Sequence, residues 1–131
     1  MTEFSSTVSL AKTREEVYAF LSDLNNHQQL MPENVYNWSS TADEARFTIQ
    51  NMAKLVLKVS ERIPGEKIVL IPAEPAPIDL NLQWILGGEN GTVTATLLIS
   101  AELNMMMKVL ASGPLQKLAD HQTERLKSLL G

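Results

Sequence analysis

Three consecutive methionines, Met105 to Met107, stand in the stretch LNMMMKVLASGPL, between a strand-like run and a helix-like run. Thioether side chains can bind a soft metal, fill an irregular core or line an apolar cavity. Adjacent helix residues point about 100° apart, so these three cannot converge on one metal ion. No cysteine or histidine lies nearby to complete a site. We therefore expect no metal here. Three alternatives stay open: the methionines fill gaps between helix and sheet, form a wall or lid of an apolar cavity, or make a subunit contact.

Gln122 is the most unusual polar residue of the C-terminal segment, because it falls on an apolar helical stripe between Leu118 and Leu126. A glutamine buried in such a place needs hydrogen-bond partners. Backbone groups or a buried water molecule can supply them. The alternative is that Gln122 points into a cavity and orients a ligand, since a few polar groups give an apolar pocket its specificity.

The ionisable residues form no catalytic arrangement. Asp120 and His121 are neighbours on the predicted helix, so their side chains diverge, and Asp120 belongs to the solvent-facing stripe. His27 lies in the polar stretch NNHQQ, where we expect a solvated loop histidine. The chain has no H-E-x-x-H spacing, no G-x-S-x-G, no P-loop and no dinucleotide-binding glycine pattern. We predict no catalytic residue, no metal site and no cofactor.

Composition and charge narrow the class of protein. The chain has 131 residues, a size suited to one domain, and a net charge of −4 without a lysine or arginine cluster. That charge argues against nucleic acid or an anionic membrane as the main partner. The absence of cysteine excludes thiol chemistry and suits a reducing cytoplasm. We expect no signal peptide from the start MTEFSSTVSL, which lacks a positively charged segment followed by an apolar run. No apolar stretch is long enough to span a bilayer, so we expect a cytoplasmic protein.

Hydrophobic periodicity indicates the elements that position these residues. Residues 4–10 alternate as a first strand, and residues 13–24 form a helix with Thr13 and Glu16 as a capping box. A short helix or turn follows, and from residue 35 to 103 the period is mostly two. One face of these strands is apolar and the other mostly polar, which is typical of an antiparallel sheet with a single covered face. The cover is an amphipathic C-terminal helix, with a break or kink expected at Gly113–Pro114.

The order of strand, helix, short helix, six strands and long helix resembles the START-like (SRPBCC) superfamily, of the polyketide cyclase and lipid-transfer type. The likeness is greatest in TREEVYAFLSDLNNHQQLMP, from Thr13 to Pro32, and in LNMMMKVLASGPLQKLADHQTERLKSLL, from Leu103 to Leu130. The resemblance implies one α+β domain over residues 1–131 with a helix-grip fold. In that fold a curved seven-stranded antiparallel sheet wraps around a long C-terminal helix, with one or two short helices after the first strand. A ligand cavity lies between sheet and helix. The superfamily includes carriers, enzymes and regulators, so the fold alone implies no single function.

We therefore predict a carrier or sensor that binds an apolar or amphipathic small molecule, lipid-like or polycyclic, between the sheet and the C-terminal helix. The predicted lining is Trp84, Leu97, Met106, Leu110, Leu118 and Gln122. One alternative is an enzyme of the polyketide-cyclase or aromatase kind, for which the sequence offers Gln122, Asn51 or Tyr36 as interior polar groups. Another is a protein-interaction module or homodimer that uses the surface of Met105 to Met107.

Overall fold

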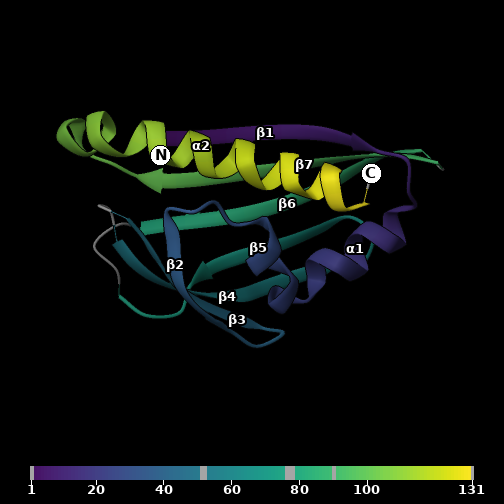
Figure 1. The fold of residues 1–131 in the computed structure, drawn as a ribbon, viewed down its shortest axis with the longest axis horizontal. Coiled ribbons are helices and arrows are strands. Elements are labelled where there is room, and N and C mark those ends of the chain that lie inside the picture. Colours follow the sequence, from purple (N-terminus) through teal and green to yellow (C-terminus); the bar gives the residue numbers. More distant parts are fainter. Residues whose placement is uncertain (1, 51–52, 76–78, 90, 131) are drawn as a thin grey trace.

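Figure 1 shows the computed structural model of the chain, which describes residues 2–50, 53–75, 79–89 and 91–130. Its elements are β1 (Thr2–Leu10), α1 (Arg14–Ser22), the 3-10 helix η1 (Leu24–Leu30), β2 (Val35–Ser40), β3 (Glu44–Ile49), β4 (Ala53–Ile63), β5 (Lys67–Pro72), β6 (Asp79–Glu89), β7 (Thr92–Glu102) and α2 (Met105–Leu130). The predicted order of one strand, two short helices, six strands and a long helix is confirmed.

The seven strands form one antiparallel sheet in the order β1-β7-β6-β5-β4-β3-β2, so β1 and β2 are its edges. The sheet is curled, and α2 packs on its β1 and β7 side (Figure 1). α1 packs instead on β5 and β6, and η1 lies between α1 and the end of α2. This is the predicted α+β helix-grip fold.

The inner face of the sheet forms the core. On β7 every second residue is fully buried, which follows from the period of two of a strand. These residues are Val93, Ala95, Leu97, Ile99 and Ala101. α2 contributes its own apolar stripe to the same core, so sheet and helix cover each other as the periodicity predicts.

α1 and α2 both begin at the caps that the sequence supplies. The amide of Glu16 donates to Thr13 Oγ1 at 3.2 Å, which confirms the predicted cap of α1. At the start of α2, Asn104 Oδ1 accepts a hydrogen bond from the amide of Met107 at 2.8 Å. The turn after β7 therefore passes directly into the helix.

α2 is one helix from Met105 to Leu130 with Pro114 inside it, so the break expected at Gly113–Pro114 is absent, while the alternative of a kink stays a prediction. Pro114 has no amide hydrogen, so the carbonyl of Leu110 lacks its helical partner. Leu110 and Gly113 are exposed, and water can reach this turn. Solvent exposure thus lets the helix continue where a buried proline would disrupt it.

Side chains of α2 also cover the free edge of β1. Gln116 Nε2 donates to the carbonyl of Ser5 at 3.1 Å, and Lys127 Nζ donates to the carbonyl of Ser9 at 2.6 Å. An open strand edge offers unpaired backbone groups to other chains. Here the helix that completes the core also satisfies part of that edge.

His27 is buried and not solvated as the sequence suggested. η1 has three residues per turn, so Leu24, His27 and Leu30 share one face, and all three point into the core. Nε2 of His27 lies 2.7 Å from the carbonyl of Leu21, and since a carbonyl only accepts, Nε2 carries the proton. Burial lowers the pKa of His27 to about 4, although the bond to Leu21 and the charge of Asp23 oppose the change.

The free energy of unfolding should fall as the pH is lowered from 6.5 toward about 4. Unfolded His27 takes up a proton below its ordinary pKa of 6.5, whereas folded His27 stays neutral until the pH approaches about 4. This difference corresponds to roughly 3 kcal/mol of stability that is present above pH 6.5 and lost in that window. Urea unfolding of wild type and His27→Gln across the window measures it. The variant should lack this component, and an equal pH dependence in both proteins would contradict the account.

Candidate functional site

A row of directly opposed residues crosses the inner face of the sheet. Ser6 on β1 pairs with Leu97 on β7. Leu97 in turn pairs with Trp84 on β6, and Trp84 pairs with Ile68 on β5. Opposed residues of antiparallel strands point to the same face. Because Leu97, Trp84 and Ile68 are fully buried, this row forms an apolar floor inside the molecule.

α2 is held over the β1 end of this row. Thr123 Oγ1 lies 2.6 Å from Ser6 Oγ, and it also donates to backbone carbonyls of its own helix. This contact sets the rotation of α2, so that Gln122 and Leu118, one turn apart, both lie on the buried side. The helix therefore presents an amide and an apolar side chain toward the interior above the sheet.

Gln122 is fully buried with both of its polar atoms unpaired. Among the residues that the structure describes, neither Oε1 nor Nε2 of Gln122 has a hydrogen-bond partner. Nε1 of Trp84 is buried without a partner in the same way. Each unsatisfied buried polar group costs about 1–3 kcal/mol. Gln122 and Trp84 thus leave two donor nitrogens and one acceptor oxygen without a hydrogen-bond partner among the described residues.

Four of the six predicted lining residues are buried: Trp84, Leu97, Leu118 and Gln122. Met106 and Leu110 do not join them, because their side chains face solvent at the start of α2. Met107 packs against the core and Ala111 is buried, so these two take the inward positions of the same turns. Contact of all six residues with a ligand stays a prediction.

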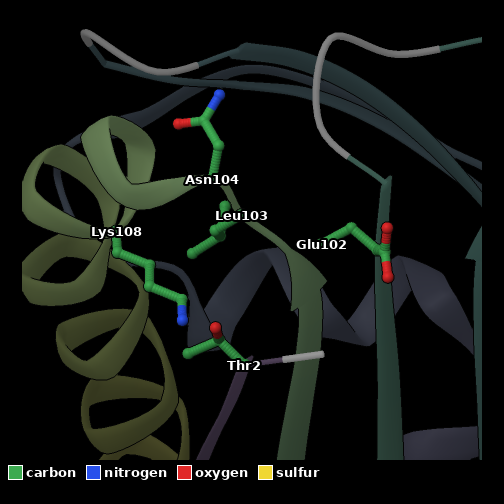
Figure 2. Close-up of a pocket in the computed structure, with 5 residues that line it drawn as sticks. All are labelled: Thr2, Glu102, Leu103, Asn104 and Lys108. Atoms are coloured by element: carbon green, nitrogen blue, oxygen red, sulfur yellow. The ribbon is translucent and has the colours of Figure 1, made fainter.

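A pocket of about 380 Å³ lies beside the first turn of α2 (Figure 2). Its lining comes from the start of β1, the end of β7 and the turn into α2: Thr2, Glu102, Leu103, Asn104 and Lys108. Figure 2 shows the side chains of Thr2 and Lys108 pointing toward one another and the carboxylate of Glu102 pointing away from Lys108. The volume is in the range of small-molecule sites. Thr2 reaches this pocket because it pairs with Ala101, a long-range contact for which the sequence has no signal.

The other candidates from the sequence lie elsewhere. Asp120 is exposed and accepts a hydrogen bond from Gln116 at 3.0 Å, while the neighbouring His121 is half-buried. Tyr36 is 46% exposed on the edge strand β2, so it is not an interior group. Asn51 lies outside the described residues.

Neither a metal centre nor a membrane-spanning helix is found in the described ranges. No group of three or more histidine or carboxylate side chains there is placed to hold a metal ion. No helix in the same ranges is long and apolar enough to cross a bilayer.

The class that this architecture defines is the START-like helix-grip fold, and comparison with solved structures gives the same class. A START superfamily protein from Mycobacterium smegmatis is similar with 16% identity and a TM-score of 0.67, over 97% of this chain and 98% of that chain. KanY, solved by NMR, matches with 14% identity and a TM-score of 0.81, over 98% of this chain and 97% of its own. XoxI from Bacillus cereus matches with 9% identity and a TM-score of 0.77, over 99% of this chain and 96% of its own.

These similarities establish the fold but do not identify the function, which depends on the residues of the site. No protein-family model matches the sequence, and no curated protein sequence matches it either. The resemblance to START-like proteins that the sequence suggested is thus confirmed at the level of the fold.

Substitution of two adjacent residues of α2 should change stability in opposite directions. Gln122→Leu should raise the free energy of unfolding by about 1–3 kcal/mol, because it removes two buried polar atoms that lack partners. Thr123→Val should lower it by about 1 kcal/mol, because it removes the bond to Ser6. Urea unfolding of the ligand-free proteins measures both. A Gln122→Leu variant less stable than wild type would show that the amide is already satisfied in the empty protein.

Proposed function

We propose that the protein binds an apolar or amphipathic small molecule between the sheet and α2, as a carrier or sensor. The observation that carries this proposal is Gln122, a fully buried amide with both polar atoms unpaired on an otherwise apolar stripe. In this proposal residues 1–131 act as one START-like domain. The matches to solved structures, which cover 97% of the chain or more, support that reading.

The interior favours a particular ligand chemistry. Its apolar floor suits a hydrocarbon chain or ring, and burial of such surface supplies the main driving force. Gln122 and Trp84 can donate to a carbonyl or hydroxyl oxygen, and Gln122 can also accept from a hydroxyl. A buried carboxylate would need a cation beside it. The buried polar residues in the described part of the chain are His27, Gln122 and Thr123, and none is charged at pH 7. We therefore infer a neutral oxygen-bearing ligand group.

The interior offers little to the cyclase or aromatase alternative. Such an enzyme needs a group inside the cavity that takes up or releases a proton. His27 is the one ionisable side chain among those buried polar residues of the described structure, and its Nε2 proton is directed at the carbonyl of Leu21. No observation therefore places an acid or base against a ligand, and binding without chemistry is the better account.

The test is a comparison of two ligands of equal chain length. Octan-1-ol carries a neutral hydroxyl, whereas octanoate carries a charge, and their binding is measured by isothermal titration calorimetry. Wild type should prefer octan-1-ol at pH 7. Gln122→Leu should weaken that binding by about thirtyfold, since two hydrogen bonds of about 1 kcal/mol each are lost with the amide. Trp84→Phe should weaken it less, because it removes one donor and keeps a ring.

The matched control is Lys117→Leu, which introduces the same residue at an exposed position of the same helix. It should leave the affinity for octan-1-ol unchanged. Native mass spectrometry of protein purified from its own host should show a bound small molecule. A protein that emerges empty and binds neither octan-1-ol nor octanoate would contradict the proposal.

A further inference from the structure

The start of α2 carries an apolar surface that faces away from the core. Met105, Met106, Val109 and Leu110 are 85%, 74%, 83% and 69% exposed. At 100° per residue these four side chains span one arc of roughly 140° around the helix, and Met107 on the opposite side packs on the core. We call these four residues the α2 tip. Exposed apolar patches of this kind mark contact sites.

The α2 tip is too small for a stable dimer. The other large apolar side chains exposed in the described structure are Tyr36, Ile85 and Leu129, which lie on β2, on β6 and at the far end of α2. None of these elements extends the tip. A standard protein interface buries about 800 Å² on each partner, from 20–30 residues a side. Four side chains supply a small part of that, which argues against a second copy of the chain as the occupant.

The charge around the α2 tip differs from that of the whole chain. Residues 105–119 contain Lys108 and Lys117 and no aspartate or glutamate, whereas the chain has a net charge of −4. Lys108 lies between Met106 and Val109 in the sequence. Glu102 lines the same pocket as Lys108, but its carboxylate points away from Lys108 (Figure 2). Charges on a protein surface interact over about 8 Å at physiological salt. The overall negative charge therefore does not decide what this end of the molecule meets.

We propose that the α2 tip inserts into the surface of a phospholipid bilayer and that Lys108 favours anionic lipids there. The start of α2 lies at one end of the longest axis of the molecule, where it can reach a flat surface (Figure 1). Methionine, valine and leucine side chains partition into the outer acyl region, while a lysine extends its ammonium to the phosphates. The pocket of Thr2, Leu103 and Lys108 opens beside the same turn. Docking therefore brings the pocket to the lipid surface.

The test uses vesicles of phosphatidylcholine alone and of phosphatidylcholine mixed with phosphatidylglycerol, with binding measured by flotation. Wild type should bind the mixed vesicles reversibly and more tightly than the neutral ones. Met106→Ser combined with Leu110→Ser should weaken binding to both by about tenfold or more. Lys108→Gln should remove about fivefold of affinity from the mixed vesicles and leave neutral vesicles unchanged. Leu129→Ser, at the other end of α2, is the matched control and should bind as wild type.

Three results would overturn the proposal: no vesicle binding by wild type, equal binding by the Met106→Ser, Leu110→Ser variant, or a wild-type dimer that this variant converts to monomer in sedimentation. All substituted residues are exposed, and equal urea midpoints confirm that the variants fold. The proposal does not depend on the interior ligand. Binding of octan-1-ol is measured in parallel. A wild-type protein that binds vesicles but not octan-1-ol would overturn only the proposed function. A wild-type protein that binds octan-1-ol but not vesicles would overturn only the membrane docking.

Discussion

The attachment of α2 to the edge strand β1 determines where the candidate site lies. Thr123 contacts Ser6, and Lys127 bonds the carbonyl of Ser9 one turn later. Both contacts lie on the outermost strand, so the helix is fixed at one side of the curled sheet and its stripe faces inward. A rotation by one residue, about 100°, would carry Gln122 out of the interior. The position of the buried amide is thus a consequence of how helix and edge strand meet.

That position is unfavourable for the empty protein. Thr123 is satisfied by Ser6 and by carbonyls of its own helix, whereas Gln122 beside it has no partner in the described structure. A leucine at this position would continue the stripe formed by Leu118 and Leu126. Natural sequences break such local rules mainly where function requires it. The unpaired amide, together with Nε1 of Trp84, is therefore the strongest indication that the interior receives a ligand.

Most of the fold could be predicted from the sequence because the spacing of buried apolar residues follows the repeat of each secondary structure. A strand buries every second residue and an amphipathic helix one stripe, so the order of elements and the position of Gln122 were accessible. Three features were not. His27 looked solvated among polar neighbours, but a 3-10 helix turns every third residue inward. The sequence left open whether Met105 to Met107 fill the core, line a cavity or make a subunit contact, and the pocket at Thr2 depends on strand register. Each of these requires tertiary contacts that periodicity does not contain.

The side-chain amide of Gln122 tests the central claim most directly. In a nitrogen–proton correlation spectrum of the labelled protein, its Nε2 protons report hydrogen bonding to any interior molecule. On addition of octan-1-ol we predict that the Gln122 amide resonances shift and that their exchange with water slows, while those of Gln116 stay in place. Unchanged Gln122 resonances at saturating octan-1-ol would contradict a ligand site built around this residue.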